Sequence, residues 1–142
     1  MNSEIEALPI LLQKAREATV LSVRQILADF DLTEQQWRVL RTTYDAGELN
    51  AQELAHKSAI LGPSLSRILN RLETDGLLVR RTSKGDLREL TIKLSPAGKR
   101  LHNKIQPVLS QQYNQFSEKL GVRKGKQLTE LLEHVASLAQ SA

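Results

Sequence analysis

The residues from Pro63 to Asp75 combine a buried stripe with side chains suited to bonding nucleic acid. Leu and Ile recur there at three- and four-residue steps, which predicts a helix with one apolar face. The opposite face carries Ser64, Ser66, Arg67, Asn70 and Arg71. In a major groove, Arg can reach guanine or phosphate and Asn can pair with adenine, while serines at a helix start can meet phosphate. The alternative is a plain helical hairpin with a solvated polar face.

A second polar group lies at a turn further along the chain. The segments Leu78–Thr82 and Glu89–Leu94 change the apolar period to two, so they predict a β-hairpin whose tip holds Lys84, Asp86 and Arg88. An arginine on a thin ribbon can enter the narrow, negative minor groove, and Asp86 could hold it by a charge-assisted pair. The alternative is a solvated loop with an incidental ion pair.

Positive charge is concentrated in this same region. The chain has 20 Lys and Arg against 16 Asp and Glu, a net charge of +4. From Arg67 to Arg100 there are nine basic and four acidic residues, or +5, so the remaining 11 basic and 12 acidic residues carry −1. A basic patch confined to one segment is typical of a nucleic-acid surface, although solvated faces are often basic too.

A third group suggests a ligand pocket. Arg16 interrupts an apolar stripe of the first helix, where a charge must reach solvent, pair or bind something. Trp37, the only tryptophan, opens the next helix, and Arg41 lies one turn further on. Together they could form an apolar pocket with a carboxylate clamp for a small acid. The alternative places Trp37 in the core and pairs Arg16 with an acidic residue at the dimer interface.

Two capping-box patterns position these groups. Thr33 with Gln36 starts one helix, and Asn50 with Glu53 starts a short helix, Ala51–Lys57. The first of these helices is expected to bury Trp37, Leu40 and Tyr44. The short helix, a Gly-Pro turn and the polar helix then form a helix-turn-helix pattern.

Apolar helices flank this module at both ends. One is expected from Ile5 to Phe30, a second from Ser95-Pro96, and a third after a breaking stretch at Gly121–Gly125. Pro107 should kink or end the second. The flanking helices have apolar faces but no sheet or bundle of their own to pack on, so packing against a second copy of the chain is expected. A monomeric six-helix bundle is the competing arrangement.

The predicted fold is therefore mainly α: a winged helix-turn-helix with a small two-stranded wing (α+β) and flanking dimerisation helices. We expect residues 32–95 to form the DNA-binding domain, and residues 1–31 and 96–142 to form the dimerisation helices. The expected partners are double-stranded DNA and a second copy of the chain.

The composition argues against other classes. The chain has no cysteine, and its three histidines are dispersed without a metal-ligand spacing, so no metal site and no cofactor are expected. No phosphate loop or nucleophile elbow is present, which argues against an enzyme. No apolar run reaches the roughly 18 residues of a membrane span, and the first residues lack a signal-peptide pattern, so a cytoplasmic protein is expected.

The chain resembles the multiple antibiotic resistance regulator (MarR) family of winged-helix dimeric repressors over nearly its whole length. The residues that carry the resemblance are Leu32–Leu40, Pro63–Glu73, Asp75–Leu78, Asp86–Arg88 and Leu94–Gly98. The resemblance implies base and phosphate contacts by the five polar residues of the helix, a minor-groove role for Arg88, and dimerisation through the first and last two helices.

A narrower similarity is to the homoprotocatechuate degradation operon repressors. It lies in Leu11–Ala18, Thr33–Arg41 and Ile60–Leu65. It implies a repressor of an aromatic-acid catabolic operon, bound to an inverted-repeat operator and released by a small aromatic acid. Two alternatives stay open: a MarR-type regulator of another operon without such a ligand, and a non-specific architectural protein that binds phosphates alone.

Overall fold

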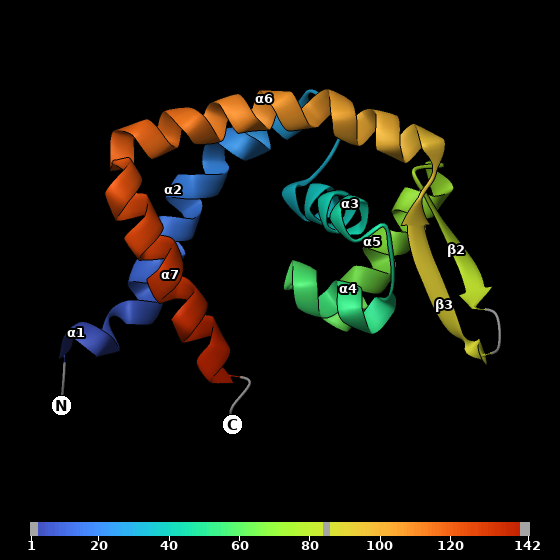
Figure 1. The fold of residues 1–142 in the computed structure, drawn as a ribbon, viewed down its shortest axis with the longest axis horizontal. Coiled ribbons are helices and arrows are strands. Elements are labelled where there is room, and N and C mark those ends of the chain that lie inside the picture. Colours follow the sequence, from blue (N-terminus) through green and yellow to red (C-terminus); the bar gives the residue numbers. More distant parts are fainter. Residues whose placement is uncertain (1–2, 84–85, 140–142) are drawn as a thin grey trace. The chain divides into compact units, whose positions relative to one another are not determined.

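A computed structural model describes residues 3–83 and 86–139, and the side chains of all of these except residue 83 and residues 86–89 (Figure 1). The helices are α1 (Ser3–Glu6), α2 (Leu8–Ala28), α3 (Glu34–Ala46), α4 (Ala51–Ser58), α5 (Gly62–Thr74), α6 (Pro96–Leu120) and α7 (Val122–Leu138). The strands are β1 (Glu48–Asn50), β2 (Leu78–Ser83) and β3 (Asp86–Leu94). This mainly helical fold with a small sheet confirms the predicted fold class. The chain divides into two compact units, residues 1–108 and 109–142.

Both capping boxes form in the first unit. The Thr33 hydroxyl accepts from the backbone N–H of Gln36 at 3.1 Å, and the Gln36 side chain accepts from the N–H of Thr33 at 3.0 Å. Asn50 and Glu53 exchange the same pair of bonds at 2.8 and 3.2 Å. The starts of α3 and α4 are thus fixed by local chemistry, as the sequence predicts.

The sheet has three strands among the described residues, in the order β1–β3–β2: β2 and β3 form the predicted two-stranded wing, and β1 is an additional strand. Both neighbours of β3 run antiparallel to it: Leu49 pairs with Ile92, and Arg80 pairs with Ile92 from the other side. Leu49 is buried, and this anchors the short strand between α3 and α4. The extra strand ties the base of the hairpin to the helical core.

One continuous core holds the helices and the sheet of the first unit together. Its fully buried side chains come from α2, α3, α4, α5, β2 and β3 and include Leu27, Leu40, Leu54, Leu72, Leu78 and Ile92. Burying each such side chain contributes about 1.5–3 kcal/mol. The orientation of α5 relative to the hairpin is therefore set by packing.

Two helix boundaries differ from expectation. The first helix divides at Ala7, because Pro9 lies in the first turn of α2 and cannot donate a hydrogen bond to the preceding turn. Gly121 caps α7 with a φ of +96°, so Gly125 lies inside that helix instead of ending a break.

Pro107 does not end α6, which continues to Leu120. Its ring removes one backbone donor, so the carbonyl of Asn103 receives no bond from that residue. Tyr44 is 39% exposed, so its expected burial is also wrong. Its ring nevertheless has a packing partner, which belongs to the site below.

Candidate nucleic-acid interface and effector cavities

Helix α5 presents the two faces that the sequence predicts. Leu65, Leu69 and Leu72 are each no more than 3% exposed and pack into the core. On the other side, Ser66, Arg67, Asn70 and Arg71 are exposed and Ser64 is half-buried. We call these five residues the polar face of α5. Small and hydrogen-bonding side chains on a rigid helix are what readout of base edges requires.

The turn between α4 and α5 is held from α3. Ala59 ends α4 in the left-handed conformation at a φ of +54°. Arg38 donates from Nη1 to the Ser58 carbonyl at 2.9 Å and, more weakly, to the Ala59 carbonyl at 3.4 Å. These bonds satisfy carbonyls that a helix end leaves without partners. The turn that leads into α5 is thereby tied to the start of α3.

The polar face is partly organised by contacts within the protein. Arg71 donates from Nε to Asp75 at 3.0 Å, and Arg67 lies 3.5 Å from the Ser64 hydroxyl. Asn70 accepts a 2.7 Å bond from Nη2 of Arg80, a residue of β2. Sequence reasoning missed Arg80, because nothing local connects this strand residue with the helix.

Arg80 is itself fixed by Glu73 on α5. Nε and Nη2 of Arg80 donate to the two carboxylate oxygens of Glu73 at 3.2 and 3.0 Å, a forked geometry. The hydrogen bond from Arg80 lowers the pKa of the Glu73 carboxyl below its ordinary value, and the same bond raises the pKa of Arg80. Both groups therefore remain charged near neutral pH.

The base of the hairpin is joined to the end of α5. Ser95 donates from its hydroxyl to the Gly76 carbonyl at 2.6 Å and accepts from the N–H of Gly98 at 3.0 Å, so it is the N-cap of α6 as predicted. Its own N–H donates to the Leu77 carbonyl at 3.1 Å. Helix α5, β2 and the start of α6 therefore share one network of hydrogen bonds.

The tip of the hairpin carries the remaining predicted DNA contacts. Lys84 lies outside the described residues. Asp86 and Arg88 fall in β3, but their side chains lie outside the description. The roles expected for these three residues stay predictions.

Arg16 forms an ion pair with Glu34 of the same chain. Its Nη2 lies 3.2 Å from Glu34, whose carboxylate also accepts from Arg38 at 3.0 Å. Arg16 is about half exposed, at 48%, whereas Glu34 is only 15% exposed. A chain of charged contacts therefore runs from α2 through Glu34 and Arg38 to the carbonyls at the end of α4.

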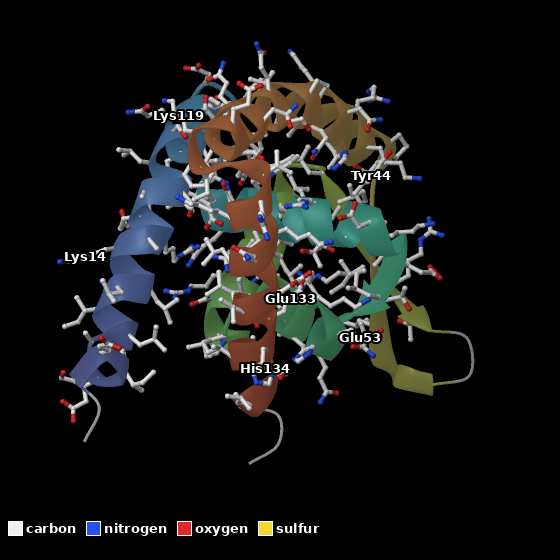
Figure 2. The ribbon with its side chains drawn as sticks, turned by 60° about the vertical axis from the view of Figure 1, so that its left-hand side comes forward. Lys14, Tyr44, Glu53, Lys119, Glu133 and His134 are labelled. Atoms are coloured by element: carbon white, nitrogen blue, oxygen red, sulfur yellow. The ribbon has the colours of Figure 1, made fainter. Side chains whose placement is uncertain are left out.

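Trp37 is part of the core, at 4% exposure, and one face of its ring meets His102 from α6. The centroids of these two rings are 5.3 Å apart and their planes differ by 15°. The His102 ring also stacks on Tyr44 at 3.7 Å; Tyr44 is labelled on α3 in Figure 2. His102 is 4% exposed, and its Nε2 has no hydrogen-bond partner within the described structure. Its helical spacing from the buried Ile105 was the available signal, which sequence reasoning did not use.

The three predicted effector residues are placed in different surroundings. Arg16 lines a cavity of about 380 Å³, the Arg16 cavity, together with Arg24, Leu32, Thr33, Glu34 and Gln35. Arg41 lines a cavity of about 480 Å³, the Arg41 cavity, together with Arg38, Thr42, Asp45, Ala46 and Lys57. Trp37 lines neither of these two cavities. Arg41 also lies 3.9 Å from Asp45, a long contact between two exposed side chains.

The terminal helices expose apolar side chains. In the first unit these are Ile5, Ile10, Leu11 and Leu21, each more than half exposed. In the second unit, α7 has no buried residue, and it exposes Leu128, Leu131, Leu132, Val135 and Leu138. Glu133 and His134, labelled in Figure 2, lie among them in the sequence. Exposed apolar surface of this extent marks an interaction site.

Two searches of the described residues found nothing. None of their helices combines the length and apolar character needed to cross a membrane. No group of three or more His, Asp or Glu side chains within that part of the chain could hold a metal ion.

The pair α4 and α5 with the adjoining β2–β3 hairpin defines a winged helix-turn-helix domain. The sequence profile of the MarR family matches residues 32–90. The chain is 38% identical over 136 residues to the homoprotocatechuate degradative operon repressor of Escherichia coli, covering 96% of this chain and 92% of that protein. It is also 38% identical to the HTH-type transcriptional regulator FarR of Neisseria gonorrhoeae, covering 96% and 93%.

A solved structure is also similar to this chain. The crystal structure of NadR in complex with 4-hydroxyphenylacetate matches with a TM-score of 0.80 and 39% identity, covering 89% of this chain and 90% of that one. The chain belongs to the MarR family of winged-helix transcription regulators. This confirms the resemblance seen in the sequence, including its narrower similarity to homoprotocatechuate operon repressors.

Proposed function

We propose that this chain is a homodimeric transcriptional repressor that binds an inverted-repeat operator and is released by a small aromatic acid. The observation that carries the proposal is the polar face of α5, which is fixed by a packed core beside a basic hairpin. In this proposal Ser64, Ser66, Arg67, Asn70 and Arg71 contact the major groove, and Lys84, Asp86 and Arg88 act at the wing. In this proposal the protein regulates transcription in the cytoplasm and is not an enzyme.

The homodimer is supported by the apolar residues of the terminal helices. An isolated chain would leave the Leu and Val residues of α7 in water, whereas a second copy offers the same residues for a self-complementary interface. Two copies also present two α5 helices, as recognition of two half-sites requires.

The aromatic acid is supported by two relatives, since NadR is bound to 4-hydroxyphenylacetate and the Escherichia coli relative is named for a homoprotocatechuate operon. In this chain a carboxylate could bind at the Arg16 cavity or at the Arg41 cavity, both of which hold at least two arginines.

The Arg16 cavity suggests how such a ligand would weaken DNA binding. A ligand carboxylate would compete with Glu34 for Arg16, and Glu34 also holds Arg38, which in turn binds the carbonyls at the end of α4. Redistributing these contacts would shift the population toward dimers whose two α5 helices no longer match the half-site spacing.

Titration of promoter DNA with the purified protein tests the proposal. The wild type should prefer promoter fragments over random fragments, and 4-hydroxyphenylacetate should weaken binding. Arg88→Ala should weaken operator binding by roughly 1–3 kcal/mol, as expected for a good base contact. Unchanged retardation of the operator by this variant would reject the role of the wing.

Arg16→Ala and Arg41→Ala separate the two cavities. The variant at the true site should bind DNA normally but no longer respond to the ligand, and the other variant serves as its matched control. A normal ligand response in both variants would reject the arginine clamp.

A further inference from the structure

The amide of Asn70 is held in one orientation by a residue of the neighbouring strand. Nη2 of Arg80 lies 2.7 Å from the amide atom that faces it. A guanidinium has only donors, so this amide atom must be the oxygen, Oδ1.

Arg80 cannot easily turn away from this contact. Its Nε and Nη2 are both bonded to Glu73, which lies on the same helix as Asn70 and one turn further on. The side chain of Arg80 is 24% exposed, so the fork is also partly shielded from water. Nη2 uses one of its two hydrogens for Glu73 and the other for Asn70, so the three side chains form one unit.

The consequence concerns the other end of the amide. With Oδ1 directed at Arg80, the Nδ2 group is the free end, and no acceptor for it occurs among the described residues. Asn70 is exposed on the polar face of α5. It therefore offers DNA two hydrogen-bond donors, while an acceptor lone pair is already engaged.

We propose that Arg80 and Glu73 determine specificity indirectly, by fixing Asn70 as a donor toward the base edge. This inference rests on the proposed DNA-binding function. It differs from the sequence-based expectation that Asn70 pairs with adenine through both amide atoms. That pairing would need the second lone pair of Oδ1 to accept from N6 of adenine, at an oxygen that already accepts from the Arg80 guanidinium. A donor instead reads the acceptors of guanine, of thymine O4 or of adenine N7, and rejects the N4 amino group of cytosine. Arg80 is a positioning residue that need not touch DNA.

Base preference at every operator position tests this proposal. Asn70→Ala first identifies the position in each half-site that depends on Asn70, where the wild type should disfavour cytosine by roughly 5- to 150-fold. Arg80→Met removes the guanidinium and frees the amide to rotate. It should reduce the preference at that same position to within about two-fold, leave other positions unchanged, and add nothing further in the double variant with Asn70→Ala.

Arg81→Met is the matched control. Arg81 is the exposed neighbour of Arg80 on β2, and successive strand residues point to opposite faces. Its loss removes the same charge but leaves Asn70 held, so any loss of affinity should be the same for all operator sequences.

Asn70→Asp is a second variant that tests the proposal even if Arg80→Met fails to fold. Aspartate keeps an oxygen facing Arg80 but replaces the outward donor with an acceptor, so the fold should persist while the preference against cytosine at this position is removed or reversed. A uniform loss of affinity in Arg80→Met, or a strict requirement for adenine in the wild type, would overturn the proposal. A wild type with no base preference at any position would overturn the proposed function as well, whereas normal preference that Asn70→Ala leaves unchanged would overturn this inference alone.

Discussion

Gly98 lies where the start of α6 crosses the chain between α5 and β2, and there it has no room for a side chain. A Cβ at this position would lie far inside contact distance of the Leu77 carbonyl oxygen, 3.0 Å from the Leu77 carbonyl carbon and 3.4 Å from Cβ of Leu94. The obstructing atoms are backbone, and Leu77 is fixed because its N–H donates to Leu72 at 2.9 Å and its carbonyl accepts from Ser95 at 3.1 Å. Relief of the clash would break these bonds.

Gly98→Ala should therefore destabilise the protein. Overpacking costs about 1–3 kcal/mol, and a rigid backbone obstacle favours the upper half of that range. The gain from replacing a helical glycine by alanine offsets roughly 0.5–1 kcal/mol of it. We expect a net loss of about 2 kcal/mol in the free energy of unfolding, together with weaker operator binding because α5 and the hairpin meet at this point.

Urea unfolding at a fixed protein concentration measures the effect. Gly62→Ala is the matched control, since Gly62 also lies in the first turn of a helix but a Cβ there meets nothing within 4 Å. The control should be neutral or more stable by up to about 1 kcal/mol. If Gly98→Ala unfolds within about 0.5 kcal/mol of the control, the packing argument at this junction is refuted.

Three further predictions follow from the contacts above. Thr33→Ala should lose the capping box of α3 and about 1 kcal/mol of stability in urea unfolding, whereas Thr33→Ser should retain most of it; equal stabilities would contradict the capping role. Because Arg80 lowers the pKa of Glu73, the stabilisation from this pair is present above the ordinary carboxyl pKa and is lost as the pH falls through the lowered pKa. Urea unfolding at a series of pH values should therefore show that Arg80→Met loses less stability on acidification than the wild type does. Parallel pH profiles of the two proteins would reject this. Leu132→Asp should produce monomers in sedimentation equilibrium while Glu133→Gln, beside it on α7, stays dimeric; two dimers would remove α7 from the interface.

Local signals in the sequence predicted the helical framework well. The pairs Thr33 with Gln36 and Asn50 with Glu53 define helix starts because each box is complete within four residues. The buried and the exposed face of α5 can also be predicted from the sequence, since burial follows directly from the helical period.

Contacts between segments that are distant in the sequence could not be predicted from local signals. Strand β1 has only three residues, and its identity depends on pairing Leu49 with Ile92 far along the chain. The contact between Arg80 and Asn70 likewise needs the packing of β2 against α5. In the sequence Arg80 is one more basic residue of a strand, whereas in the structure its guanidinium donates a hydrogen bond to Asn70.

The candidate effector site shows the same limit. The sequence grouped Arg16, Trp37 and Arg41 by type and approximate spacing. In the structure, Trp37 stacks on His102, while Arg16 and Arg41 line two different cavities. No local pattern in the sequence brings His102 to the aromatic rings of α3, because that contact depends on the packing of α6 against α3.

The ratio of affinities for the promoter fragment and for a scrambled fragment of equal length and composition tests the central claim most directly. Measured at one salt concentration, with the number of bound chains determined in the same titration, it separates base readout from phosphate attraction. We predict two chains per operator and a ratio of at least about 10³. A ratio near one, or a single chain bound per site, would contradict a dimer that reads sequence through α5 and the wing.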